Sequence, residues 1–130
     1  MSIDSVDTSV APLPASILSQ GSNLIVSIHA ALDDEQLTRL QRDLLERVGR
    51  TRARGILIDV AALDVLDSFA ARTLSDLAYM AQLRGARTVI VGIMPEVAMA
   101  LVRLSVRMPL TETALDLEEG LEWLSSDDPT

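Results

Sequence analysis

The fold is decided by residues 55–73, which read GILIDVAALDVLDSFAART. Residues 56–58 are branched and apolar without a polar break, which is typical of a strand buried on both faces of a sheet. The strand pattern ends at Asp59, and apolar residues return at helical spacing further on, so Asp67 or Ser68 is predicted to be a helix N-cap. A serine hydroxyl is therefore expected at a helix N-terminus, where free N–H groups and the macrodipole favour an anion such as phosphate.

Length and composition indicate one domain. The chain has 130 residues, enough to bury a core without disulfides or metal ions. Hydrophobic residues make up 48% of it and the mean hydropathy is +0.28, but no apolar run approaches the roughly 20 residues that cross a bilayer. The N-terminus has no basic segment before an apolar stretch, and the chain has no cysteine. We therefore expect a soluble, cytoplasmic protein with no membrane partner.

Charge and residue usage exclude several functions. The net charge of -8 disfavours nucleic acid and anionic membranes, because both need clustered cations. All eleven basic residues are arginine, and the absence of lysine excludes a Walker A loop and a Schiff-base enzyme. With His29 as the only histidine, a zinc site would depend on carboxylates, which is uncommon. We expect protein partners, with no metal site, no cofactor and no nucleic acid.

Strand and helix patterns alternate along the chain. Apolar runs at residues 17–18 and 24–28 flank a turn and predict a hairpin. The complete order is β-β-α-β-α-β-α-β-α, which predicts an α/β fold with a mixed, mostly parallel sheet, an N-terminal hairpin edge and about four helices. The predicted domain covers residues 16–125, between a flexible N-terminal tail at 1–15 and a disordered C-terminal tail at 126–130.

The helix patterns include caps and apolar stripes. Asp33 and Gln36 have the spacing of a capping box, as do Asp116 and Glu119. Pro95 suits the first position of the third helix. The stripes predicted to face the core are Leu37, Leu40, Leu44 and Val48 in the first helix, Val97, Leu101 and Leu104 in the third, which Met108 and Pro109 are expected to end, and Leu117, Leu121 and Leu124 in the last. The second helix has residues at helical spacing at Phe69, Thr73, Leu74, Leu77 and Ala81.

Two groups of residues leave alternatives open. Phe69 suits either the core or an exposed anchor for a partner. Four arginines near the end of the first helix either compensate its negative C-terminus or form a basic patch for a partner. These arginines are Arg47, Arg50, Arg52 and Arg54.

Ser68 also has two interpretations. Serine is a favoured N-cap, and a cap contributes only about 1 kcal/mol of stability. However, Asp59, Asp64 and Asp67 precede it, and three acids exceed what one cap requires. Catalysis by Ser68 is not expected, because His29 is the only imidazole and no lysine could replace it as a base.

Residues 58–69, followed by residues 89–98 (VIVGIMPEVA), resemble the STAS domain family of anti-sigma-factor antagonists and stressosome scaffold proteins. The likeness covers about residues 16–124 and implies the STAS fold. Within the family, the chain is most similar to the RsbS-like branch of small, single-domain stressosome proteins.

The resemblance implies a phosphorylatable serine after an aspartate at a helix start. Ser68 after Asp67 matches that motif, with Asp64 and Phe69 as further residues of the partner-binding switch loop. Simple antagonists usually continue with a small residue and glycine, whereas this chain has Phe69 and Ala70. Larger stressosome paralogues often carry a second acceptor threonine, and the matching position here is Ala100. The first difference favours the stressosome branch of the family, and the second favours the RsbS-like proteins within that branch.

The implied function is that of a non-enzymatic scaffold and switch protein of a general stress-response pathway. Such a protein sequesters a serine/threonine kinase (RsbT-like) and releases it when the switch serine is phosphorylated. The implied partners are that kinase, a STAS-domain sensor paralogue (RsbR-like) and a PP2C-type phosphatase, in a homo-oligomer or a large hetero-oligomer. Two alternatives are a simple anti-sigma-factor antagonist that binds an anti-sigma kinase and a ligand-sensing STAS module. For the latter, the sequence offers no phosphate cradle beyond one helix N-terminus.

Overall fold

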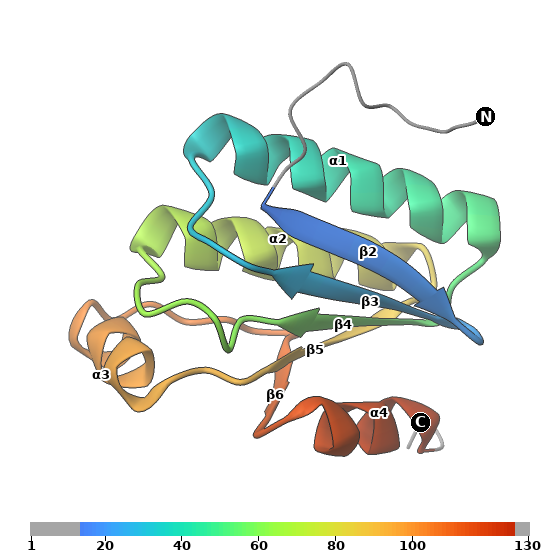
Figure 1. Ribbon diagram of the computed structural model, residues 1–130. Coiled ribbons are helices and arrows are strands. Elements are labelled where there is room, and N and C mark those ends of the chain that lie inside the picture. Colours follow the sequence, from blue (N-terminus) through green and yellow to red (C-terminus); the bar gives the residue numbers. More distant parts are fainter. Residues whose placement is uncertain (1–13, 127–130) are drawn as a thin grey trace.

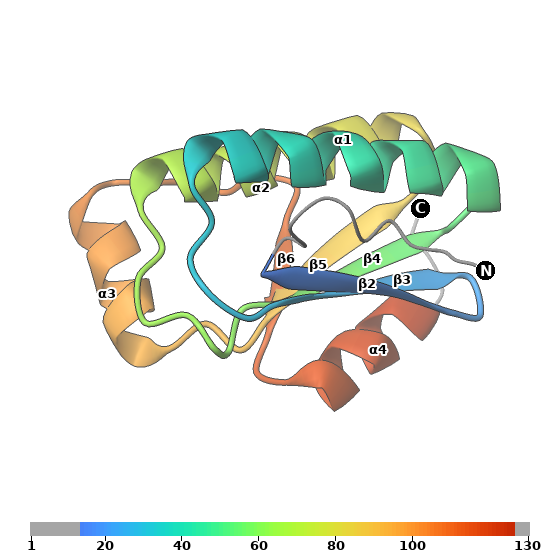
Figure 2. The same cartoon turned by 45° about the horizontal axis from the view of Figure 1, so that its top comes forward.

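Five strands form one sheet in the order β2-β3-β4-β5-β6, with helices on both faces (Figures 1 and 2). The computed structural model describes residues 14–126, and most of the two predicted tails lies outside these residues. The elements follow the predicted order. Their bounds are β2 (Ala15–Gln20), β3 (Asn23–Ile28), α1 (Asp34–Thr51), β4 (Gly55–Asp59), α2 (Ser68–Leu83), β5 (Arg87–Val91), α3 (Pro95–Arg103), β6 (Glu112–Ala114) and α4 (Leu117–Ser125).

The pairing of the strands confirms the predicted mixed sheet. β2 and β3 form the antiparallel hairpin, with Ala15 opposite Ile28, and the other neighbouring pairs are parallel. Because each parallel connection passes through a helix, the carboxyl ends of β3, β4 and β5 lie at one edge of the sheet. The loops that leave this edge include the one that carries Ser68.

The central strand β4 is buried on both faces, as its sequence predicts. Ile56 and Ile58 pack into the main core with α1 and α2, and both are fully buried. Leu57 points to the opposite face, where it packs with Leu121 and Leu124 of α4. A strand with apolar contacts above and below needs apolar residues at successive positions, which is what residues 56–58 supply.

Helices α1 and α2 lie side by side on one face of the sheet (Figures 1 and 2). The predicted stripe of α1 is buried throughout, and the predicted capping box is present: Asp33 accepts from the Gln36 N–H while the Gln36 side chain accepts from the Asp33 N–H. The Gln41 amide also donates to the Thr73 carbonyl of α2, over 3.1 Å. This bond fixes how the two helices pack.

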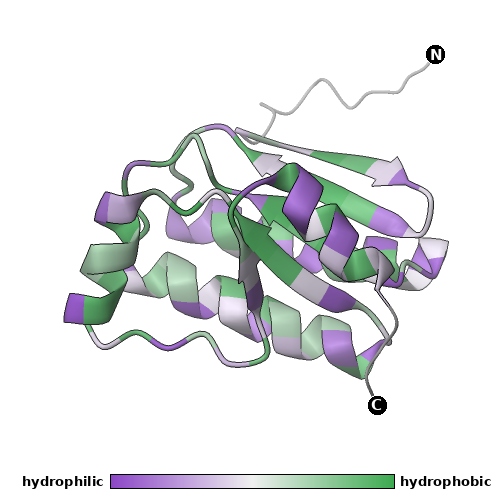
Figure 3. Cartoon of the chain, turned by 90° about the horizontal axis from the view of Figure 1, so that it is seen from below, coloured by the Kyte–Doolittle hydropathy of each residue, from purple (hydrophilic) through white to green (hydrophobic). Residues whose placement is uncertain are grey.

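Helix α4 covers the other face and packs closely against it. Figure 3 shows hydrophobic strands beneath α4, which carries hydrophilic residues on its outer side. Gly120 is the buried residue of this helix, and a Cβ added there would lie 2.6 Å from Val91 Cγ1 and 2.8 Å from Leu57 Cδ1. The absence of a side chain at Gly120 therefore sets the distance between α4 and the sheet.

The predicted end of the third helix and the predicted burial of Leu104 and Leu117 are wrong. Leu104 is exposed, because α3 ends at Arg103, one turn before the expected stop at Met108 and Pro109. Leu117 is also exposed, because Gly120 rather than Leu117 occupies the point of contact with the sheet.

The second predicted capping box is only half formed. Asp116 accepts from the Glu119 N–H at 2.9 Å, as expected of a cap. The Glu119 carboxylate accepts from the Leu115 N–H instead of the Asp116 N–H. Among the helices of residues 14–126, none has the length and apolar content needed to span a membrane.

Gly120→Ala should destabilise the protein by about 1–3 kcal/mol, because the new methyl group would overlap Val91 and Leu57. This cost exceeds the roughly 1 kcal/mol that alanine gains over glycine in a helix. Urea unfolding measures the effect, with Glu118→Ala on the exposed side of α4 as the control, expected within about 0.5 kcal/mol of wild type. Equal stability of Gly120→Ala and wild type would contradict the close packing of α4.

Candidate functional site

The loop between β4 and α2, residues 60–67, is held to the body of the protein by the side chain of every third residue. Val60, Leu63 and Leu66 are buried in the main core, whereas Val65 is 63% exposed. The Val60 N–H also donates to the Val91 carbonyl of β5 over 3.0 Å, which extends the strand pairing into the loop. We call residues 60–67 the switch loop, and its backbone has a fixed path.

A close contact with the neighbouring loop also constrains this path. Gly92, directly after β5, has a φ of +82°, which favours glycine. A Cβ at Gly92 would lie 2.8 Å from Ala61 Cβ. Glycine therefore allows the loops after β4 and β5 to meet at the carboxyl edge of the sheet.

Asp67 is the N-cap of α2, which settles the choice between Asp67 and Ser68. Its backbone is extended, with φ -78° and ψ 175°, and its Oδ1 accepts from the Ala70 N–H at 2.8 Å. Its carbonyl accepts from the Ala71 N–H at 3.0 Å, the first bond of the helix. Ser68 is thus the first helical residue and is not needed as the cap.

The Ser68 side chain is partly exposed at this helix start. No hydrogen bond of its hydroxyl is found within residues 14–126. The N–H groups of Ser68 and Phe69 precede the first intrahelical bond. They can therefore donate to an anionic group attached to the Ser68 hydroxyl. The geometry combines an accessible hydroxyl with a local environment that tolerates added negative charge.

The three aspartates before Ser68 lie around this loop but have different roles. Asp59 Oδ1 accepts from the Ala61 N–H at 2.9 Å and shapes the first turn after β4. Asp67 caps α2. Asp64 is exposed. Two of the three acids therefore have a structural role, which is more than the sequence argument assigned to them.

Phe69 is 40% exposed, which favours the exposed position over the core among its two interpretations. Because Val65 is exposed in the adjoining loop, apolar groups lie on both sides of Ser68 in sequence. A small cavity of about 50 Å³ also borders this loop, lined in part by Leu66 and Asp67. The switch loop and helix start thus present both charge and apolar surface.

Other candidate groups lie away from Ser68. His29 Nε2 lies 3.3 Å from the Ser16 hydroxyl on the hairpin, so it does not serve Ser68 as a base. Arg52 and Arg54 line an open hollow of about 610 Å³ at the ends of α1 and α2, where Arg84 joins them. Residues 14–126 contain no cluster of His, Asp and Glu that could hold a metal ion.

The sequence profile of the STAS domain family matches residues 15–119, from β2 into α4. The chain belongs to the STAS domain family. The match includes the switch loop and the start of α2. In this STAS domain the first residue of α2 is a serine, Ser68, which directly follows the capping residue Asp67.

Several known STAS proteins are similar to this chain. The RsbT co-antagonist protein RsbRA of Bacillus subtilis is 26% identical over 98 residues, which cover 75% of this chain but only 36% of RsbRA. The structure of a serine-to-glutamate variant of RsbS from Moorella thermoacetica is 32% identical, with a TM-score of 0.74 and coverage of 85% of this chain and 93% of RsbS. A chain of the stressosome, described as a signal integration and transduction hub, is 29% identical, with a TM-score of 0.67 and coverage of 84% and 95%. These similarities confirm the predicted resemblance to RsbS and to stressosome proteins.

Ser68→Ala should cost about 1 kcal/mol or less, because the Ser68 hydroxyl has no capping role in this STAS domain. Asp67→Ala should cost more, about 0.5–2 kcal/mol, because it removes the acceptor of the Ala70 N–H. Chemical denaturation of both variants measures the difference, and Asp64→Ala is the exposed control. A loss for Ser68→Ala that equals or exceeds that for Asp67→Ala would make Ser68 a structural residue.

Proposed function

We propose that this STAS-domain protein is a stressosome scaffold and switch. It holds a switch-type serine/threonine kinase (RsbT-like) and releases it when that kinase phosphorylates Ser68, which controls a general stress-response pathway. The protein itself is not an enzyme. The observation that carries the proposal is the division of labour at the start of α2: Asp67 caps the helix, and the Ser68 hydroxyl is left for modification.

The charge around Ser68 explains how phosphorylation would act. A phosphate adds about -1.5 to -2 charges at pH 7, beside Asp64 and Asp67. The N-terminus of α2 tolerates this charge, because its macrodipole and free N–H groups stabilise an anion. A partner surface that packs on the apolar groups Val65 and Phe69 would not tolerate it, since it would have to desolvate the phosphate. Phosphorylation therefore favours release of the partner over unfolding of the loop.

The similarity to RsbS and to RsbRA supports the choice of partners. RsbRA is described as a co-antagonist of RsbT, and the stressosome chain comes from a large assembly. By analogy, this protein co-assembles with an RsbR-like sensor paralogue, binds an RsbT-like kinase and is dephosphorylated by a PP2C-type phosphatase. The alternative, an anti-sigma-factor antagonist, would capture its kinase in a small complex, so the mass of the assembly distinguishes the two.

Exposed apolar side chains on α3 support an assembly. Met99 is 51% exposed and Val102 is 77% exposed, and α3 lies at the same end of the molecule as the start of α2 (Figures 1 and 2). Contiguous apolar surface of this kind normally marks an interface.

The partner-switching prediction concerns Ser68 itself. After incubation with the partner kinase and ATP, mass spectrometry should locate phosphate on Ser68, and the phosphorylated protein should bind the kinase more weakly. Ser68→Ala should keep the kinase bound. Ser68→Asp should weaken binding only in part, because one carboxylate has less charge and fewer acceptor oxygens than a phosphate. Ser75→Ala, at a serine further along α2, is the matched control and should behave as wild type.

Two outcomes would contradict the proposed switch. One is phosphate on another residue while Ser68 stays unmodified. The other is unchanged kinase binding after complete phosphorylation of Ser68.

The assembly prediction concerns mass in solution. Light scattering should show a species larger than the 14.1 kDa monomer, either for the protein alone or after mixing with the sensor paralogue. Val102→Glu should reduce the mass of that species without lowering stability, because the side chain is exposed. Leu83→Glu, at a similarly exposed position near the other end of α2, is the control. A clean monomer under both conditions would refute the scaffold.

A further inference from the structure

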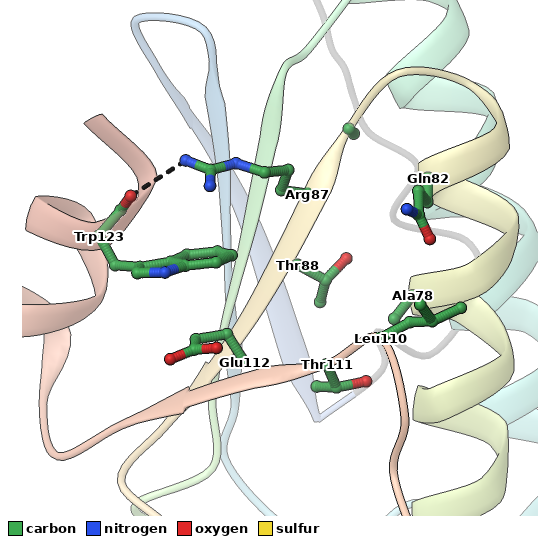
Figure 4. A pocket seen from close by; sticks show the side chains of 9 residues that line it. Ala78, Gln82, Arg87, Thr88, Leu110, Thr111, Glu112 and Trp123 are labelled. Carbon is green, nitrogen blue, oxygen red and sulfur yellow. Dashed lines mark hydrogen bonds between the residues drawn. The ribbon is translucent and has the colours of Figure 1, made fainter. Parts of the chain in front are cut away.

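A second cavity lies at the far end of α2 from Ser68. It has a volume of about 280 Å³ and opens between the C-terminal half of α2, the starts of β5 and β6, and α4 (Figure 4). Its polar lining comes from Gln82, Thr88, Thr111 and Glu112, and Trp123 forms one wall. These residues are far apart in sequence and meet only in the folded chain.

The short edge strand β6 creates the cavity. β6 begins at Glu112, which pairs with Val89, so the first two residues of β5 have no strand beside them on that edge. The chain before β6 diverges from the sheet at Leu110 and Thr111, and the space between this segment, α2 and α4 is left open.

Two buried hydroxyl groups border this space without partners. Thr88 is 2% exposed, and its Oγ1 has no hydrogen-bond partner among residues 14–126. The Oγ1 of Thr111 is likewise buried and unpaired. In Figure 4 both hydroxyls point toward α2, across the cavity. A buried hydroxyl without a partner is rare because it loses its hydrogen bonds to water, so a polar molecule bound beside this pair would gain two hydrogen bonds.

The positively charged group at the cavity, the Arg87 guanidinium, already interacts with α4. The Arg87 guanidinium lies 4.1 Å from the centre of the Trp123 ring, and its Nη2 donates to the Trp123 carbonyl over 3.0 Å. It also donates to the carbonyls of Leu124 and Ser126 at the end of α4. Arg87 thus holds α4 in place, and the remaining charged group, Glu112, is an acceptor. An anionic ligand does not fit this lining.

We propose that this cavity binds a small, uncharged, planar molecule of the nucleobase or cyclic-amide class. Such a molecule carries donors and acceptors on one edge, which match the two threonine hydroxyls and the Gln82 amide on the α2 side of the cavity. The volume lies just below the usual range for ligand pockets, so the ligand has on the order of a dozen non-hydrogen atoms. The inference does not depend on the proposed partner switching.

Leu110 is the side chain that moves on binding. Both hydroxyl oxygens are shielded from water, so a ligand reaches them only when part of the lining shifts. Leu110 is 54% exposed and has a φ of 68°, a conformation that leucine rarely adopts. Its displacement would open the cavity without disturbing the paired part of the sheet.

Binding can be followed directly, because Trp123 is the only tryptophan in the chain. Adenine, uracil and 2-pyrrolidone are titrated into the full chain, and the Trp123 indole N–H and the Thr88 amide are monitored by NMR. At least one probe should shift both signals in a saturable manner. The absence of a saturable shift with all three probes would overturn the proposal.

Thr88→Val tests the role of the hydroxyl, because it keeps the shape of the side chain. It should weaken binding by about tenfold or more. In the free protein the melting temperature should stay the same or rise, because an unpaired buried hydroxyl is removed. Thr113→Val, on the exposed side of β6, is the control and should keep the affinity of wild type.

Two results with these variants would contradict the ligand site. A clear fall in melting temperature for Thr88→Val would mean that ordered water satisfies the hydroxyl in the free protein. Equal affinity of Thr88→Val and wild type would mean that the probe binds elsewhere.

Discussion

The burial of β4 on both faces is the constraint on which the rest of the structure depends. Ile56 and Ile58 hold α1 and α2 on one face, and Leu57 holds α4 on the other. With β3 and β5 parallel on either side, the carboxyl end of β4 can only lead into a loop at one edge of the sheet. The position of Ser68 follows from this, because the switch loop spans the short distance from β4 to α2.

The backbone of the switch loop is held in one conformation. Three of its side chains are buried, its first N–H pairs with β5, and Asp67 ends it with a cap. A phosphate on Ser68 would thus change the charge of a surface whose shape stays the same. Under the proposed function, release of the partner would then arise from desolvation and repulsion at the contact surface.

Much of this arrangement could be predicted from local sequence. The buried strand at residues 56–58, the caps at Asp33 and Asp67, and the element order depend on short patterns of apolar and capping residues. Such patterns show which apolar side chains a segment must bury and which backbone N–H groups its own side chains can cap. Both requirements are met within the segment itself, so they are the same in the folded chain.

The errors arose where tertiary contacts override local patterns. Leu117 has the spacing of a core residue, yet Gly120 takes the contact with the sheet that Leu117 was expected to make. The cavity near Trp123 left no local signal at all, because its lining comes from four separate segments of the chain.

The central claim, that phosphorylation of Ser68 acts by charge on a loop of fixed conformation, is tested most directly by comparing backbone amide NMR spectra and hydrogen exchange of the phosphorylated and unmodified proteins. The account predicts that chemical shifts change around residues 59–71, while the exchange protection of α2 and β4 remains the same. Loss of protection along α2, or shift changes throughout the sheet, would show that phosphate acts by refolding and would contradict the account.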